Sequence, residues 1–137
     1  MNAFFKTIDT VLVGRKTHDF MVSMGQPAFP GMATYVCTRN QSPKQYKDVK
    51  YVLDDPVQFA KELRDKPGKN IWLMGGSDLA KSFFEARMID EVDVAIHPIL
   101  LGKGIPLFTE MSAEIPLKLL EERMHPNGLV QLRYECV

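Results

Sequence analysis

The chain has 137 residues, of which 45% are hydrophobic and 25% charged, a composition typical of one globular domain with a single core. Seventeen acidic side chains balance seventeen basic ones, so no global field attracts the protein to nucleic acid or to an anionic membrane surface. We therefore predict a single domain over residues 1–137 that recognises its partners locally, and we expect no nucleic-acid or membrane partner.

Location and redox state follow from equally simple features. No apolar stretch approaches the ~20 residues of a membrane-spanning helix, and the N-terminal MNAFFKTID lacks the layout of a signal peptide. A cytoplasmic protein is predicted. Cys37 and Cys136 lie in separate apolar segments, which favours buried free thiols over a disulfide. The three histidines are scattered without other ligands at metal-binding spacing, so no metal site is predicted.

Apolar periodicity, interrupted by glycine and proline, predicts the elements of the first two thirds of the chain. A helix start is expected at Asp55-Pro56 and a stop at Pro67-Gly68. The predicted helices cover residues 3–8, 16–24, 57–66 and 78–86, and the predicted strands cover 10–13, 33–38, 49–53 and 70–74.

The last third changes character, because three strand-like segments are separated by loops and turns. They cover residues 91–98, 117–124 and 129–137, with a turn at 125–128 between the last two. Alternating βα units followed by antiparallel strands predict an α/β fold, in which a mixed, mostly parallel sheet is flanked by helices and ends in a C-terminal β-hairpin.

Residues 13–17 form the first of three glycine-bearing corners, between a predicted strand and a predicted helix. Gly14 lets the backbone approach a ligand closely, the helix start offers unpaired N–H groups, and Arg15 and Lys16 add full positive charges. Phosphate would bind well at such a corner. An ordinary turn with a solvated basic pair fits the same residues, because short glycine motifs are weak signals.

The other two corners follow the predicted strands 70–74 and 91–98. The backbone amides of Gly76 and Ser77 are placed to cradle a pyrophosphate, while Ser77 or Asp78 is expected to cap the next helix. The G-x-G-x-x-G fingerprint of dinucleotide-binding folds is absent. In the third corner two glycines surround Lys103, which either faces an anion at a pocket mouth or belongs to a plain surface connection.

Four segments, read together, are specific enough to indicate a family. They are residues 9–17, 75–83, 88–92 and 98–108. The last three strongly resemble the reductase domain of riboflavin biosynthesis, and the first is similar to the strand and helix start of dihydrofolate reductases. The chain therefore resembles the dihydrofolate reductase-like superfamily, in its riboflavin-reductase branch, over nearly its whole length.

The resemblance implies NADPH as cofactor. It places the first corner on the phosphates, the residues after the next strand on the adenosine end with its 2′-phosphate, and the double glycine on the pyrophosphate. The implied cofactor-binding residues are Gly14, Arg15, Lys16, Thr17, Thr38, Arg39, Gly75, Gly76 and Ser77, with Asn40 beside Arg39. The implied reaction is hydride transfer to a small heterocyclic or ribityl substrate, like that of a 5-amino-6-(5-phosphoribosylamino)uracil reductase.

The sequence departs from the family at its start. Relatives begin with a strand and loop of the type V-x-x-S-x-D-G-x-I-A, which lies in mid-sheet beside the nicotinamide, and this sequence starts after that point. Because proton donation in the family draws on the missing region, no catalytic residue is assigned. Two interpretations stay open: an NADPH-dependent reductase, and a non-catalytic protein that binds nucleotide or dimerises.

Two expectations concern the assembly of the chain and its sheet. Members of this branch commonly associate, so a homodimer is expected. In the family sheet, residues 70–74 and 91–97 flank the missing strand, and each buried backbone group left unpaired there would cost on the order of 1–3 kcal/mol. We therefore expect a closed gap, with direct pairing of 70–74 and 91–97 favoured over insertion of residues 1–8 or a strand from a partner chain.

Overall fold

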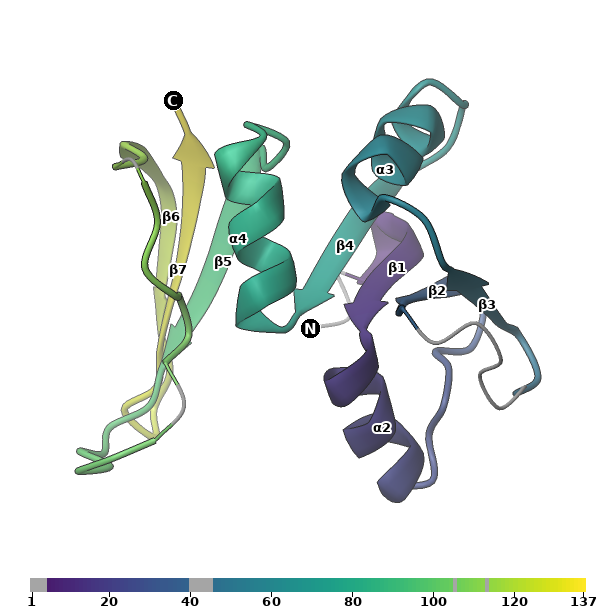
Figure 1. Cartoon of the computed structure of the whole chain (residues 1–137). Coiled ribbons are helices and arrows are strands. Elements are labelled where there is room, and N and C mark those ends of the chain that lie inside the picture. The colour runs from purple at the N-terminus through teal and green to yellow at the C-terminus, as the bar shows by residue number, and fades with distance from the viewer. Residues whose placement is uncertain (1–4, 40–45, 105, 113) are drawn as a thin grey trace. The chain divides into compact units, whose positions relative to one another are not determined.

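The computed structural model of the chain describes residues 5–39, 46–104, 106–112 and 114–137. The chain forms two units, Met1–Ala80 and Lys81–Val137. The first unit holds a four-stranded parallel sheet and the second a three-stranded antiparallel sheet (Figure 1). None of the described helices is long and apolar enough to cross a membrane.

The first unit alternates strands and helices around a central strand. Its order along the sheet is β3-β2-β1-β4, and all neighbouring strands are parallel. The elements are β1 (Ile8–Gly14), α2 (Arg15–Ser23), β2 (Ala33–Cys37), β3 (Val49–Val52), α3 (Pro56–Arg64) and β4 (Asn70–Gly75), followed by α4 (Ser77–Glu85), which continues into the second unit.

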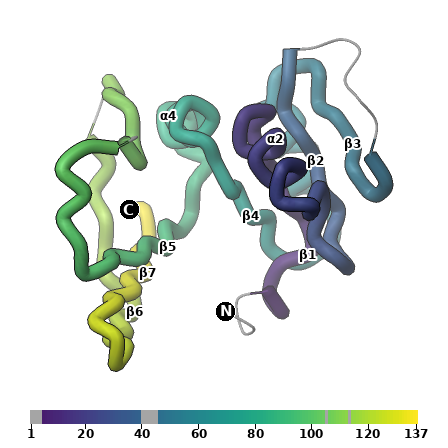
Figure 2. Tube along the Cα trace, turned by 90° about the horizontal axis from the view of Figure 1, so that it is seen from below, coloured from purple at the N-terminus to yellow at the C-terminus, as the bar shows by residue number. Residues whose placement is uncertain are grey.

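Helices cover both faces of the parallel sheet. Met21 of α2 packs with Val13 and Val36 on one face, and Figure 2 shows α2 lying against β1 and β2. Phe59 of α3 contacts Tyr35, with ring centroids 4.9 Å apart. Because neighbouring residues in a strand point to opposite faces, Tyr35 and Val36 place α3 and α2 on opposite sides. This double cover explains why the middle of β1 is fully buried.

The second unit is a meander of strands in the order β5-β7-β6. β5 spans Glu91–Ile96, β6 spans Leu117–Met124 and β7 spans Val130–Cys136. β7 pairs with both neighbours in antiparallel register, and a bulge interrupts β6 between Leu119 and Glu121. The predicted C-terminal hairpin is confirmed.

Most predicted elements agree with the structure to within two residues at each end. The helix start at Asp55-Pro56 is confirmed, since the Asp55 side chain accepts a hydrogen bond of 3.0 Å from the Val57 N–H. The short helix predicted over residues 3–8 is wrong at its end. Residues 5 and 6 are helical, whereas Ile8 begins β1, and residues 1–4 lie outside the described part. Ile8 is drawn into the sheet because its apolar side chain is buried there.

Direct pairing of residues 70–74 with 91–97 is also wrong. In the described parts of the chain β4 pairs with β1 alone and β5 pairs with β7 alone, so each strand keeps one free edge. A high cost for an open gap requires both strands to be buried. Every residue of β4 and β5 is instead half-buried or exposed, so neither strand has the buried surroundings on which the expected cost depends.

The end of α4 offers a first test of the structure. The Met88 N–H donates to the Phe83 carbonyl at 2.9 Å and the Arg87 N–H to the Phe84 carbonyl at 3.1 Å, while Arg87 has a φ of 59°. This is a helix terminus at which glycine is preferred. Arg87→Gly should therefore raise the free energy of unfolding by about 1 kcal/mol, measured by chemical denaturation. Arg87→Ala, which keeps the Cβ, should give no such gain, and equal effects of the two changes would contradict this account.

Candidate active site

Strand order places the first two predicted glycine corners at one edge of the parallel sheet. The chain runs from β1 outward to β2 and β3, then returns to the other side of β1 as β4. Ligands of open parallel sheets bind outside the carboxyl ends of the strands, at the point where the order reverses. Here β1 ends at Gly14 and β4 at Gly75, and Gly14 pairs with Cys37 at the end of β2.

The first two corners are in direct backbone contact. A Cβ added to Gly14 would lie 3.4 Å from the Gly76 amide nitrogen and 3.5 Å from the Gly75 carbonyl oxygen. A Cβ on Gly76 would lie 3.5 Å from Thr17 Oγ1, and Gly75 has a φ of 130°, which side-chain-bearing residues rarely adopt. The Gly75–Gly76 peptide bond is cis. Glycine at these positions leaves a side-chain-free surface between the starts of α2 and α4.

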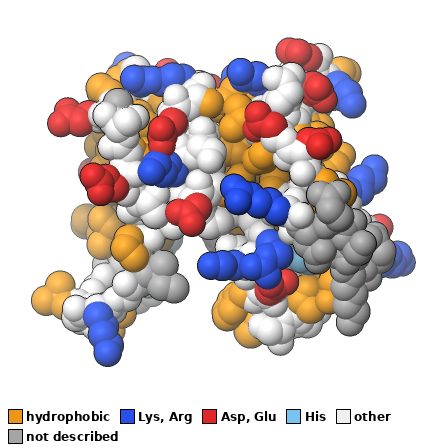
Figure 3. All heavy atoms as spheres, viewed as in Figure 1, with side chains coloured by type: hydrophobic (Ala, Val, Ile, Leu, Met, Phe, Trp, Pro, Cys, Tyr) orange, Lys and Arg blue, Asp and Glu red, His pale blue; other side chains and the backbone are white. Residues whose placement is uncertain are grey.

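The start of α2 is unusual for a helix. Its cap position, Gly14, makes no side-chain hydrogen bond, and the first turn holds no acidic residue. Arg15 and Lys16 stand there instead, although cations are disfavoured at a helix N-terminus. Arg15 pairs with Asp19 at 3.2 Å, and both side chains are more than half exposed. Free N–H groups and two cations therefore point to an anion site, and Figure 3 shows Lys and Arg side chains gathered around the beginning of α2.

The start of α4 corrects the expected cap. The Ala80 N–H donates to the Gly76 carbonyl at 3.0 Å, so Gly76 occupies the cap position, while Ser77 and Asp78 are the first two helical residues. Glycine takes the cap because the backbone turns there within contact distance of β1. Asp78 still favours the helix through its charge near the N-terminus.

The residues after β2 reach the same edge of the sheet. The Thr38 N–H donates to the Val52 carbonyl at 3.1 Å, which holds the chain in line with β3. Arg39 follows and is exposed, while Asn40 lies outside the described residues. The structure thus brings Gly14–Thr17, Thr38–Arg39 and Gly75–Ser77 to one edge. Lys103 belongs to the second unit, where it is exposed, and its anion role stays a prediction.

His18 is a buried residue of α2 that anchors this helix to the loop at Pro27. The sequence did not predict this role. The His18 side chain is buried, and its Nε2 lies 2.7 Å from the Pro27 carbonyl oxygen, which requires the proton to be on Nε2. The ring also meets Tyr46 and Tyr51 edge-on, with centroids 5.8 and 6.4 Å away. Helical spacing could have indicated that His18 is buried, because it lies three residues before Met21 and therefore on the same face of α2.

Neither cysteine is suited to nucleophilic chemistry. Both are free and half-buried, and burial raises the pKa of the Cys37 thiol to about 11. Burial, with a smaller effect of Asp90, raises the pKa of Cys136 as well. Among the described residues no cluster of His, Cys, Asp and Glu could hold a metal ion.

The pKa of Cys37 gives a second test. In a Cys136→Ser variant, alkylation of Cys37 by iodoacetamide at pH 7–8 should be about 100-fold slower than that of a model thiol, because the thiolate fraction falls tenfold per pH unit. The native state should also lose stability as the pH rises from 9.0 towards about 11, since the unfolded chain gives up this proton first. Cys37→Ser should abolish the remaining labelling, and fast labelling at neutral pH would contradict the assignment.

Comparison with known proteins identifies the family. The family model of the RibD C-terminal domain matches residues 28–130. The chain belongs to the RibD C-terminal domain family. The uncharacterized protein YwjB of Bacillus subtilis is 35% identical over 133 residues, covering 96% of this chain and 75% of its own length.

Solved structures agree with membership in the RibD C-terminal domain family. A putative riboflavin biosynthesis protein from Shewanella sp. PV-4 is 26% identical with a TM-score of 0.86, covering 100% of this chain and 78% of its own. A dihydrofolate reductase from Enterococcus faecalis, complexed with NADP(H), is 23% identical with a TM-score of 0.71. The match covers 98% of this chain and 80% of the reductase. The predicted dihydrofolate reductase-like α/β fold and its riboflavin-reductase branch are therefore confirmed.

Proposed function

We propose that this chain is an NADPH-dependent reductase that reduces a small heterocyclic or ribityl substrate, like a 5-amino-6-(5-phosphoribosylamino)uracil reductase. The observation that carries the proposal is the contact of Gly14 with Gly75 and Gly76 at the reversal point of the strand order. Membership in a reductase-like family supports it, and so does the NADP(H) complex of a solved protein with the same fold.

The residues at this edge fit a dinucleotide phosphate. The glycine surface is free of side chains, as close packing of a pyrophosphate requires. Gly14, Lys16, Thr17, Gly76 and Ser77 would hold the pyrophosphate with helix-start N–H groups and a cation. Arg39 and Arg15 would pair with the 2′-phosphate at the adenosine end through charge-assisted hydrogen bonds. The cofactor supplies the hydride, and the protein supplies binding and orientation.

NADPH should bind more tightly than NADH, because the 2′-phosphate adds charge that Arg15 and Arg39 can neutralise. Arg39→Ala should weaken NADPH binding by roughly tenfold or more and leave NADH binding nearly unchanged, since a charge-assisted hydrogen bond contributes about 1.5–3 kcal/mol. Fluorescence titration with both cofactors measures this. Arg123→Ala, in the second unit, is the control for general loss of positive charge.

The outcome of this titration decides the assignment. Equal affinities for the two cofactors would contradict the role of Arg15 and Arg39. Absence of binding by either cofactor would remove the reductase proposal.

A non-catalytic nucleotide-binding protein is the second candidate, favoured by the edges of β4 and β5 that stay unpaired in the described part of the chain. NADPH oxidation in the presence of pyrimidine or ribityl substrates separates the two. Cofactor binding without oxidation of NADPH by any such substrate would favour the second candidate.

The proposal includes a homodimer as the working form. The large apolar side chains that are exposed among the described residues favour association, because a second copy can remove them from water. Sedimentation at micromolar concentration tests it, and a monomer would contradict it. The cytoplasmic location and the single-domain organisation stay predictions.

A further inference from the structure

Exposed apolar side chains are concentrated in the second unit. Of the fourteen large hydrophobic side chains exposed among the described residues, Phe20, Met24 and Leu53 lie in the first unit and the other eleven in the second. Among the described residues of the second unit, only Phe83 and Phe84 are buried hydrophobic residues. A three-stranded sheet needs cover on its apolar face to be stable, so this distribution indicates a surface that meets a partner.

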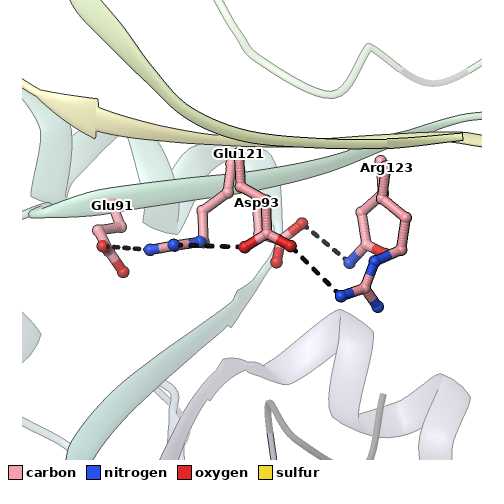
Figure 4. Close-up of polar contacts among 6 residues, drawn as sticks. Glu91, Asp93, Glu121 and Arg123 are labelled. Atoms are coloured by element: carbon pink, nitrogen blue, oxygen red, sulfur yellow. Dashed lines mark hydrogen bonds and ion pairs between the residues drawn. The ribbon is translucent and has the colours of Figure 1, made fainter.

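The register divides the three-stranded sheet into a polar and an apolar face. On the polar face Arg133 donates to Glu91 at 2.8 Å and to Glu121 at 3.4 Å, while Arg123 donates to Glu121 at 3.3 Å. Gln131 adds a hydrogen bond of 3.2 Å to Asp93 on the same face, and Figure 4 shows this network. Each of these charged groups has a polar partner on the same face, so the polar face needs no second copy to satisfy it.

The opposite face is apolar and uncovered at one end. Ile96, Val130 and Met124 lie side by side there in the register of the three strands, and Ile96 is 52% and Met124 81% exposed. At the other end Phe84 of α4 and Cys136 line one cavity, so α4 covers that end. The uncovered part is called the apolar sheet end below.

Residues 98–104, called the apolar arm, follow β5 and begin beside the apolar sheet end. Its root is fixed, because a Cβ on Gly128 in the β6–β7 turn would lie 3.3 Å from Pro98. Beyond the root, Leu100 is 99% exposed, and its neighbours Ile99 and Leu101 are also mostly exposed. Runs of exposed large aliphatic side chains are rare on monomer surfaces.

We propose that the arm and the apolar sheet end form a two-fold interface with a second copy of this chain, in which each arm covers the partner's sheet end. The proposal rests on the homodimer included in the proposed function and adds its location. An arm and an acceptor surface on the same chain are self-complementary under a two-fold axis.

The available area matches a dimer. Ile96, Ile99, Leu100, Leu101 and Met124 are exposed by 52–99%, which corresponds to on the order of 400 Å² of apolar surface per copy at roughly 100 Å² per full side chain. Two copies would bury about 800 Å² of apolar surface, roughly the apolar half of a standard interface of about 1,600 Å².

Charge complementarity also favours a second copy. Lys103 follows the apolar run of the arm, and Glu122 lies on the apolar face, in register with Leu132 and two residues before Met124. The described ion pairs include neither side chain. In the proposed dimer, Lys103 of each arm pairs with the partner's Glu122. The chain as a whole has no net charge, so two copies do not repel each other.

Sedimentation velocity of the full chain tests the interface. Leu100→Asp should raise the dimer dissociation constant by roughly 30-fold or more, as expected for a residue at the centre of an interface. The change cannot disturb the fold of one copy, because Leu100 is 99% exposed, and circular dichroism checks this. Phe20→Asp is the matched control, because Phe20 is an exposed apolar residue on α2 and its replacement should leave the dimer unchanged.

Charge reversal tests the pairing of the arm with the sheet end. Lys103→Glu and Glu122→Lys should each weaken the dimer by roughly fivefold, and the double variant should restore most of the loss, because the pair is re-formed with the charges exchanged. A double variant that is weaker than either single variant would overturn this contact.

The outcomes separate the interface from the rest of the proposed function. A wild-type monomer would overturn both the interface and the homodimer. A dimer that is insensitive to Leu100→Asp would overturn the interface and leave the homodimer in place. The reductase proposal is judged independently by NADPH titration of the wild-type protein.

Discussion

Lys16→Glu is expected to weaken NADPH binding by roughly 30-fold while raising the free energy of unfolding by about 0.5 kcal/mol. The loss of a cation and the gain of an anion beside the phosphates each cost about 1 kcal/mol at an effective dielectric constant near 20 with salt screening. The gain in stability has a separate cause. Lys16 is the second residue of α2, in a first turn that holds no acidic residue, and a negative charge there interacts favourably with the helix dipole.

Lys61→Glu is the matched control, since it makes the same change of charge in the last turn of α3. There a cation is favourable, so the variant should lose about 0.5 kcal/mol of stability and bind NADPH nearly as well as the wild type. Titration measures the change in NADPH affinity of each variant, and chemical denaturation measures the change in its free energy of unfolding. Undiminished NADPH affinity of Lys16→Glu would contradict the phosphate assignment at the start of α2.

The candidate site could be predicted from the sequence in its parts but not in its assembly. Glycine at a strand end followed by Arg15 and Lys16 indicates an anion corner by local chemistry alone. The contact between Gly14 and Gly76 joins residues more than sixty positions apart, and it exists because β4 returns to the free side of β1. Periodicity shows that a segment is a strand and does not show which strand it lies beside.

The fold shows the same division between local and long-range information. The hairpin of β6 and β7 was predictable because the turn at residues 125–128 leaves the two strands only one short connection. The pairing of β4 with β5 failed because its argument needed the burial of both strands, and burial depends on what covers them. Residue type alone gave β4 the composition of a central strand, whereas the described structure leaves it at an edge.

Because β4 is an edge strand in the described structure, we expect a second large effect: truncation of two aligned leucines should lower the free energy of unfolding by different amounts. Leu12 of β1 and Leu73 of β4 are partners in register and point to the same face of the sheet. Leu12 is 1% exposed, whereas Leu73 is half-buried. Leu12→Ala should therefore lower the free energy of unfolding by about 3 kcal/mol through lost burial and a residual cavity. Leu73→Ala should cost about half as much, because less of its side chain leaves water on folding.

Urea denaturation of both variants under one set of conditions measures the difference, with Leu12→Met as the control for a change of shape that preserves volume. An equal cost at both positions would mean that Leu73 is as deeply buried in solution as Leu12, and hence that β4 has a covering neighbour beyond β1. A cost at Leu73 near half of that at Leu12 would instead support the half-buried position that Leu73 has on the edge strand β4.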